Sequence, residues 1–296
     1  MVPKPAAATS RRRSYHDPVP TGRLARVLLA ASHPEPAALV TLLTVILSVA
    51  AGRRWDVLWV AAAVASGQVT VGWSNDYLDR DLDRVQGRAD KPLAAAGPAD
   101  RAAVRTASLA ALGACLPLSL AAGAGFAAAH LAAVGAALAY NLRLKALPLS
   151  VLPYAAAFGL LPVAVTLGLR QPRWPHAWAI AAAVLIGAGG HLAQALPDIP
   201  ADRRLGLRGL PQLIGQPASA AAAGGLLLAA SLTIALGPGR SPGPVQVAGV
   251  VAVAALAAGI VAAALSSRTR LAYRLTLAAA GLAVLSFVAG GGGGEL

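Results

Sequence analysis

Residues 244–265 read PVQVAGVVAVAALAAGIVAAAL, a run of small and aliphatic residues with one Gln and no charge. A helix of about 20 apolar residues is long enough to cross the hydrocarbon core of a bilayer. Similar blocks recur along the chain, separated by Gly, Pro or charged clusters. They predict an all-α polytopic membrane protein with about nine transmembrane helices, at residues 36–52, 55–78, 102–123, 125–142, 150–169, 175–196, 214–236, 244–265 and 271–290.

The composition supports this fold class. Of the 296 residues, 57% are hydrophobic and only 12% are charged, and most of the predicted helices lack the polar face that a soluble helix needs. Ala and Gly dominate the apolar blocks, and such small residues let helices in lipid approach closely. Cys115 is the single cysteine, which excludes an intramolecular disulfide and a cysteine-based metal site.

The net charge of +13 is explained by topology rather than by nucleic acid. The basic residues lie in short loops, without a basic stripe or interleaved aromatic residues. All but five fall on one side of the predicted membrane, which places the N-terminus in the cytoplasm and the C-terminus outside a cell membrane. We expect residues 1–30 to form a disordered basic arm, residues 31–290 a single nine-span domain, and residues 291–296 a flexible tail; the five exceptions are Arg53, Arg54, Arg170, Arg173 and Arg240.

Acidic residues gather at two helix ends, and the first cluster lies in the segment Asn75-Asp76-Tyr77-Leu78-Asp79-Arg80-Asp81-Leu82-Asp83. No Gly or Pro interrupts residues 73–86, so the second span should continue as helix through it. Asn75, Asp79 and Asp83 would then form one stripe, with Asp76 beside it and Asp81 on the far face. Oxygen ligands that repeat every turn suit Mg²⁺. The alternative is a solvated, salt-bridged helix end, since arginines alternate with the acids.

The second cluster is Asp198 and Asp202, at the end of the sixth predicted span. It lies four spans after the first, so the chain resembles two four-helix halves that present acidic helix ends to a central cavity. Pro197 and Pro200 should break or restart the helix around Asp198. These two acids extend the predicted metal site to Asn75, Asp76, Asp79, Asp83, Asp198 and Asp202.

Basic residues flank both acidic clusters. Carboxylates that hold Mg²⁺, with Arg and Lys nearby, make a site for a diphosphate, whose charge needs both metal and hydrogen-bond donors. Each basic residue taken alone is equally well explained by membrane topology. The candidate diphosphate ligands are Arg88, Lys91, Arg143, Lys145, Arg203 and Arg208.

These motifs resemble those of the UbiA superfamily of intramembrane prenyltransferases. Residues 75–83 fit the family's NDxxDxxxD motif, and 198–202 fit its DxxxD motif. Tyr140 and Lys145 match its tyrosine and lysine after the fourth span, and residues 88–93 resemble its Arg-x-x-(Arg/Lys)-Pro-Leu motif. Pro200 and Leu207 depart from the second motif. The similarity covers roughly residues 35–290.

The resemblance implies that the protein ionises a prenyl diphosphate with Mg²⁺ at the cytoplasmic side. The prenyl group would pass to a small acceptor, expected to be aromatic or a quinone precursor. We expect the catalytic residues to be Asp79, Asp198, Tyr140 and His191. Two rival functions remain. A terpene cyclase of the same superfamily would trap the carbocation within the substrate, although aromatic residues amount to only 4% of the chain. A transporter would also have paired halves, but it would carry its acids nearer the membrane midplane.

Polar residues on the second and sixth spans suggest a pocket beside the metals. His191 and Gln194 share a helix face with Asp198, and Gly189 and Gly190 leave space beside them. Buried polar groups in a span need partners, so we expect His191 and Gln194 to point into the cavity, with Gln68 and Asn75 as further pocket residues. The alternative for His191 is a hydrogen bond to a neighbouring helix. The sequence carries no signal for the oligomeric state.

Overall fold

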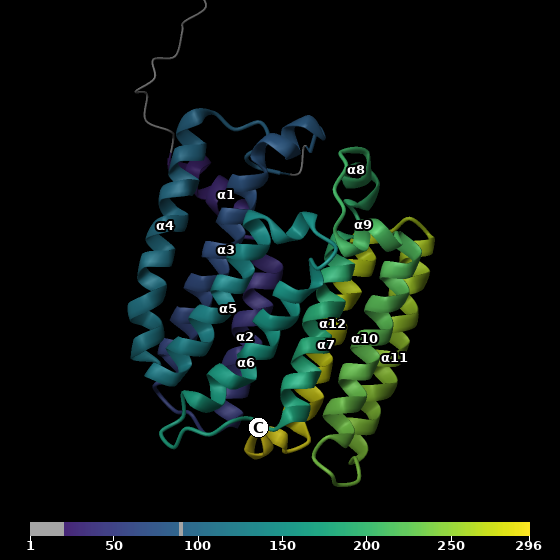
Figure 1. Cartoon of the computed structure of the whole chain (residues 1–296). Coiled ribbons are helices and arrows are strands. Elements are labelled where there is room, and N and C mark those ends of the chain that lie inside the picture. Colours follow the sequence, from purple (N-terminus) through teal and green to yellow (C-terminus); the bar gives the residue numbers. More distant parts are fainter. Residues whose placement is uncertain (1–20, 89–90) are drawn as a thin grey trace, which may run out of the picture.

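The computed structural model describes residues 21–88 and 91–296, and all regular structure within these ranges is helical (Figure 1). The all-α class is therefore confirmed. The α-helices are α1 (Thr21–Ala31), α2 (Pro34–Ala50), α3 (Val57–Val85), α4 (Pro98–Ala121), α5 (Ala124–Leu142), α6 (Val151–Leu167), α7 (Ala177–Ala195), α8 (Ile199–Arg204), α9 (Leu210–Ile214), α10 (Gln216–Leu236), α11 (Pro244–Leu265) and α12 (Thr269–Ala289), with two short 3-10 helices, η1 (Leu144–Ala146) and η2 (Gly292–Glu295).

Each of the nine predicted spans coincides with one long helix. Among the described residues, seven helices are long and apolar enough to cross a membrane, and the bent pair α1 and α2 makes an eighth if it counts as one span. The helix α6 is apolar but has only 17 residues. The protein is thus a multi-pass membrane protein, and the count of nine crossings stays a prediction.

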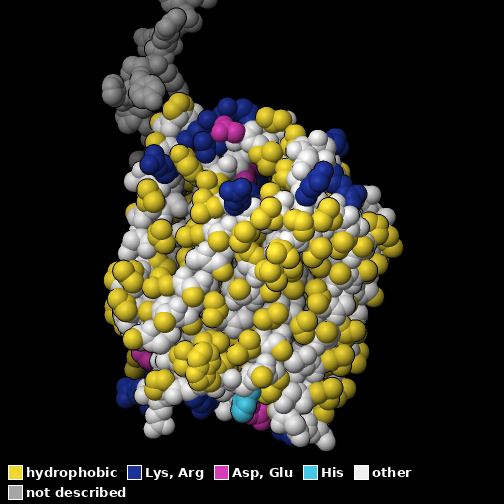
Figure 2. Space-filling model, viewed as in Figure 1, with side chains coloured by type: hydrophobic (Ala, Val, Ile, Leu, Met, Phe, Trp, Pro, Cys, Tyr) yellow, Lys and Arg dark blue, Asp and Glu magenta, His cyan; other side chains and the backbone are white. Residues whose placement is uncertain are grey.

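The long helices pack around a ring in chain order, and α12 closes the ring against α2 and α7. Figure 1 shows them standing side by side, with α8 above the ends of α10, α11 and α12 and with α9 close to those ends. Figure 2 shows a broad apolar surface between two ends that carry the charged side chains. Packing inside the ring is close: a Cβ at Gly187 of α7 would lie 2.6 Å from the Tyr154 carbonyl oxygen of α6. The predicted tight, small-residue bundle is therefore observed.

A buried arginine fastens the end of the bundle away from α8. Arg53, in the α2–α3 loop, donates hydrogen bonds to the carbonyl of Ala122 at 2.7 Å and to that of Gly168. These carbonyls cap the C-terminal ends of α4 and α6, where the helix dipole favours a cation. Asp56 accepts a third bond at 3.1 Å. Burial lowers the pKa of the Arg53 guanidinium below its ordinary value, and the Asp56 carboxylate offsets part of that fall.

The two chain ends differ from our expectation where the structure describes them. Residues 1–20 of the predicted disordered arm lie outside the described residues, but its last part forms α1, which Arg23 ties to Asp100 of α4 at 2.7 Å. We expected a flexible tail at 291–296. That segment instead forms η2, with Gly293 against the backbone of Ala50 and with Leu296 buried in the core.

A sharp bend separates α1 from α2. The helix axes differ by 64°, and His33 at the bend has a left-handed backbone with φ of 51°. The bend rests on α3 at Gly72, where a Cβ would lie 2.7 Å from the carbonyl oxygen of Ser32. This contact sets how deeply His33 reaches into the bundle.

Candidate active site

The helical ring encloses a cavity of about 660 Å³. Its charged end lies toward α8, and its apolar part extends along α2, α7 and α12 toward the opposite end of the bundle. All six predicted metal ligands line it: Asn75, Asp76, Asp79, Asp83, Asp198 and Asp202. The two acidic clusters therefore share one cavity, as the sequence predicts.

The first cluster lies on α3, which continues as helix through the motif to Val85, as predicted. Asp76 is 1% exposed and accepts bonds from Lys91 at 2.8 Å and from His33 at 2.9 Å. Asp79 is paired with Lys145 and also receives the Asn75 amide at 3.0 Å. Three bases and an amide thus surround two carboxylates.

Asp81 lies on the opposite face of α3. Its side chain is 63% exposed, and it pairs with Arg80 at 3.3 Å and with Arg84 at 3.9 Å. The cavity does not include it among its lining residues. The helical stripe deduced from the sequence therefore separates Asp81 from the other acids of the motif.

The second cluster forms where α7 ends. The helix breaks after Ala195, and Asp198 immediately precedes α8, so the predicted effect of the two prolines is observed. Arg88 pairs with Asp198 at 2.6 Å. Asp202 accepts bonds from Gln86 at 3.0 Å and from Gln212 at 2.8 Å. The second cluster is therefore held by side chains from the segment that follows α3 and from α9.

We next asked whether these residues suit a metal ion. Within residues 21–88 and 91–296, no three acidic, His or Cys side chains gather as a ready-made metal site, because basic side chains stand between the carboxylates. One carboxylate oxygen each of Asp76 and Asp83 is nonetheless buried without a hydrogen-bond partner. Such orphaned oxygens are costly unless something binds them. The donor set, made of carboxylate and amide oxygens, fits Mg²⁺.

Only half of the six predicted diphosphate ligands reach this cavity. Arg88, Lys91 and Lys145 line it beside the carboxylates. Arg143 and Arg208 are exposed and do not line it. Arg203 is also outside; it donates to the carbonyls of Gln212 and Leu213, and so joins α8 to the end of α9. Arg143 and Arg208 therefore lie on the surface, which agrees with the alternative that their charge sets the membrane topology. Arg203 holds two helices together.

The predicted pocket residues divide in the same way. Gln68, Gln194 and Tyr140 line the cavity, and Gln194 accepts a bond from the Tyr154 hydroxyl at 2.6 Å. His191, however, is 2% exposed and is not among the lining residues. The prediction that it points into the cavity is wrong.

His191 instead bonds a neighbouring helix. Its Nε2 lies 3.0 Å from the Ser150 Oγ at the start of α6, and that oxygen also accepts the Leu210 N–H at 3.0 Å. A buried imidazole needs a partner, and Ser150 supplies it. The His191 ring also lies edge-on to Tyr140, with centroids 5.4 Å apart. His191 therefore stands behind the tyrosine wall of the cavity.

Several site residues were missed by the sequence analysis. His33 bonds Asp76, and Asn141 donates to the Val71 carbonyl at 2.9 Å and lies 3.4 Å from the Asn75 amide nitrogen. Gln86 and Gln212 hold Asp202, and Arg270 lines the cavity from α12. Asn141 had a signal, since a polar residue near the end of an apolar span needs a partner. The others come from loops or helix ends, where no periodicity marks the inward face.

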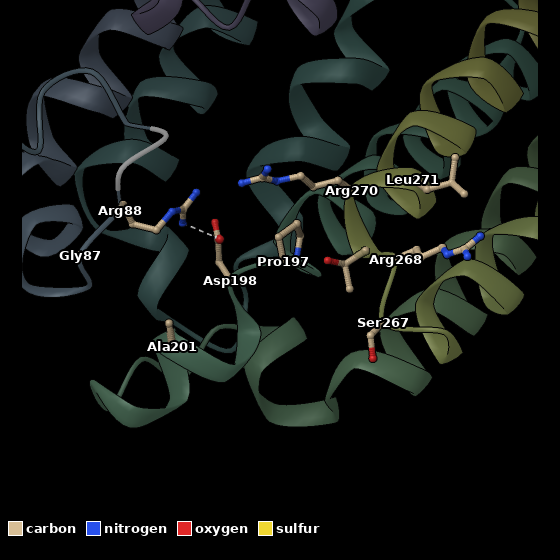
Figure 3. A pocket seen from close by; sticks show the side chains of 10 residues that line it. Gly87, Arg88, Pro197, Asp198, Ala201, Ser267, Arg268, Arg270 and Leu271 are labelled. Carbon is tan, nitrogen blue, oxygen red and sulfur yellow. Dashed lines mark hydrogen bonds and ion pairs between the residues drawn. The ribbon is translucent and has the colours of Figure 1, made fainter.

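A second, more open pocket of about 740 Å³ adjoins the cavity at its charged end. Arg88, Asp198 and Arg270 line both spaces. Figure 3 shows the Arg270 guanidinium directed toward the Arg88–Asp198 pair, whereas Arg268 points away from it. We call this second space the vestibule. It connects the acidic clusters with the surface between α8 and α12.

Carboxylates, lysines and arginines at the head of an apolar cavity inside a membrane-embedded helical ring suit a ligand with a charged head and an apolar tail. Comparison with known proteins agrees. Residues 24–275 match the model of the UbiA prenyltransferase family. The chain belongs to this family and is an intramembrane prenyltransferase.

Three relatives illustrate the likeness. Digeranylgeranylglyceryl phosphate synthase of Methanopyrus kandleri is 30% identical over 64% of this chain and 70% of its own length. A UbiA homolog from Archaeoglobus fulgidus, solved bound to GPP and Mg²⁺, superposes with a TM-score of 0.66 at 20% identity, covering 91% of this chain and 99% of that one. A structure described in connection with digeranylgeranylglyceryl phosphate synthase in membranes gives 0.63 at 14% identity, with the same coverage. The two structures share the fold.

The position of His191 leads to a prediction. Replacing His191 with Ala removes one of the two hydrogen-bond partners of the Ser150 hydroxyl and the ring behind Tyr140. We therefore expect a loss of about 1 to 3 kcal/mol in unfolding free energy. Turnover should fall, while the affinity for prenyl diphosphate in Mg²⁺ stays unchanged. Unfolding in detergent, turnover and diphosphate binding measure the three effects. Gln194→Ala, which alters the cavity wall, is the control. Unchanged stability and turnover in His191→Ala would contradict this positioning role.

Proposed function

We propose that this chain transfers a prenyl group from a prenyl diphosphate, with Mg²⁺, to a hydroxyl group of an acceptor that carries a phosphate. The family membership establishes prenyl transfer; the metal, the site residues and the acceptor are our proposal. The observation that carries it is that two acidic clusters and three bases meet at the head of one apolar cavity. That arrangement suits a ligand with a polyanionic head and an apolar tail.

The donor diphosphate would bind among the paired charges. Asn75, Asp76, Asp79, Asp83, Asp198 and Asp202 are the oxygen donors available for Mg²⁺. When bound, Mg²⁺ would supply positive charge that stabilises the departing diphosphate. Lys91, Lys145 and Arg88, which now pair with Asp76, Asp79 and Asp198, would donate hydrogen bonds to the phosphate oxygens.

Aromatic side chains line the cavity beside the charged head. Tyr140 and Tyr154 meet edge to face, with centroids 4.9 Å apart, and Phe158 stacks on Tyr154. Their π faces would stabilise positive charge that develops on the allylic carbon and would keep water from it. The same wall would serve a terpene cyclase, which therefore stays the second candidate.

The vestibule is the proposed acceptor side. It is lined by Arg88, Arg268 and Arg270, and none of its ten lining residues is aromatic. This charge suits a phosphate better than the aromatic or quinone-precursor acceptor expected from the sequence. The printed name of the Methanopyrus kandleri relative, a synthase of a glyceryl phosphate lipid, supports the same choice.

The decisive experiment compares acceptors. Purified protein would be incubated with Mg²⁺ and geranylgeranyl diphosphate, alone or with a prenylated glyceryl phosphate, its dephosphorylated form, or an aromatic acid. Mass spectrometry should detect a new ether only with the phosphorylated alcohol. A prenylated aromatic acid, with the prenyl group on a ring carbon or on oxygen, would overturn the acceptor proposal. A hydrocarbon product formed without any acceptor would identify a cyclase.

The charge distribution also supports an orientation in the membrane. We propose that α8 and the acidic clusters face the cytoplasm, because most Lys and Arg lie at that end of the chain's helices. A reporter inserted between Ala94 and Gly97 should then be cytoplasmic, and one fused after Gly294 should lie outside. Protease or thiol accessibility in intact cells measures this. The predicted topology has an odd number of spans between the two reporters. Finding both reporters on the same side of the membrane would contradict it.

A further inference from the structure

The apolar part of the cavity is long and has two ends. On α7 it is lined from Gln194, beside the acidic clusters, to Trp178. These residues are sixteen positions apart, which corresponds to about 24 Å at 1.5 Å per residue. On α12 the lining also runs to the far end of the helix, at Phe287. The cavity therefore crosses most of the thickness of the bundle.

The end away from the acids is closed by two aromatic rings. Trp178 of α7 and Phe287 of α12 meet at 68° with centroids 5.4 Å apart. Leu296 and Ile234 line the cavity beside them, and both belong to the hydrophobic core. We call Trp178 and Phe287 the floor. Apart from the Trp178 indole N–H, these side chains are hydrocarbon, so the floor would act mainly through its shape.

Each ring of the floor packs directly against a glycine. A Cβ at Gly237, at the end of α10, would lie 2.5 Å from Trp178 Cγ, and a Cβ at Gly292 would overlap the Phe287 ring. The segment that contains Gly292 is itself held: Arg173 Nε donates to the Leu296 carbonyl at 3.2 Å, and Arg240 pairs with Glu295 at 2.9 Å. Because these contacts fix the rings from behind, a ligand cannot displace the floor cheaply.

We propose that Trp178 and Phe287 limit the length of the prenyl donor to about four isoprene units. This inference rests on the proposed function, because it takes the cavity as the site of the prenyl tail. Each unit adds four C–C bonds along the chain, or about 5 Å when extended. Four units extend about 20 Å, and a van der Waals contact of about 4 Å between the last methyl group and the Trp178 ring makes up the rest of the distance to the floor. A fifth unit brings the tail to about 25 Å before that contact is added, so it must distort the floor or leave the cavity. The ligand class is thus a geranylgeranyl diphosphate.

Binding measurements test the floor without knowledge of the acceptor. The probes are the slowly ionising thiolodiphosphates of geranyl, farnesyl, geranylgeranyl and geranylfarnesyl alcohols, titrated calorimetrically against the protein in nanodiscs with Mg²⁺. Affinity should rise about tenfold or more with each added unit through geranylgeranyl, because each unit buries further apolar surface. It should then fall for geranylfarnesyl.

Two variants move the limit in opposite directions. Trp178→Ala removes the larger ring, so the ratio of geranylfarnesyl to geranylgeranyl affinity should rise at least about tenfold. Ala183→Phe places a ring on the cavity wall nearer to Gln194 and should move the optimum to farnesyl. Trp174→Ala is the matched control, because Trp174 is 72% exposed and is not among the lining residues.

The possible results distinguish a failure of the chain-length limit from a failure of the proposed function. If none of the probes binds in Mg²⁺, the proposed function fails. If geranylfarnesyl binds the unchanged protein more tightly than geranylgeranyl, the tail leaves the cavity sideways into lipid and the floor is refuted. If Trp178→Ala does not fold, Ala183→Phe still decides: an unmoved optimum refutes the floor, and a shift to farnesyl supports it.

Discussion

Asp79→Asn and Asp198→Asn are each expected to lower prenyl transfer at least about a hundredfold, the usual effect of removing a charge that holds a catalytic cation or its ligand. Each change leaves a base, Lys145 or Arg88, without its carboxylate, and each removes a negative charge that would balance Mg²⁺. Asp81→Asn is the control on the same helix. Because Asp81 faces away from the cavity with two arginines, its loss should change turnover by less than about twofold.

Turnover as a function of Mg²⁺ concentration measures these effects. The Asp79 and Asp198 variants should also require more Mg²⁺, while far-ultraviolet circular dichroism shows that the helices persist. Equal sensitivity of Asp81 and Asp79 would refute the separation of the two faces of α3. Full activity of Asp198→Asn would refute a shared site for the two clusters.

Arg53→Met is expected to have the largest effect on stability, about 3 to 5 kcal/mol, although it lies at the end of the bundle away from the acids. The change leaves the carbonyls of Ala122 and Gly168 without their buried donor. Neighbouring Arg54 is exposed, so Arg54→Met is the matched control and should cost less than about 0.5 kcal/mol.

Unfolding of both variants by denaturant in mixed micelles gives the difference in free energy. A loss below about 1 kcal/mol for Arg53→Met would show that water replaces the guanidinium at the two carbonyls, and the fastening role would then be wrong. Diphosphate binding by the folded fraction should remain unchanged, because the cavity lining excludes Arg53.

The sequence predicted the helices well because the membrane restricts the choice of structure. Each apolar block had to become a helix, since lipid offers no partners to an open backbone. The short α6 shows where this reasoning ends: it has the composition of a span but not its usual length. Arg53 shows another limit. The sequence does not distinguish Arg53 from its neighbour Arg54. Only Arg53 points inward, because the fold brings together two helix ends whose carbonyls accept its hydrogen bonds.

The site was predictable where a helix carried it. The stripe on α3 followed from the helical repeat, and the structure separates Asp81 from Asp79 as that repeat requires. His33 and Arg270 could not be found in this way, because their inward direction depends on a bend and on a helix start. His191 was misplaced for a related reason: a helix face shared with Asp198 does not fix the direction of a side chain once α7 ends before Asp198.

The contact between Gly72 and the α1–α2 bend also restricts which sequences can encode this enzyme. The backbone of Ser32 occupies the place of a side chain at position 72, and the next residue, His33, bonds Asp76 one turn further along α3. A single methyl group at 72 would lift the bend and withdraw the imidazole from the first acidic cluster. A substitution of Gly72 should therefore be tolerated only when the α1–α2 bend changes as well. We expect substitutions at positions 32, 33 and 72 to occur together among related sequences.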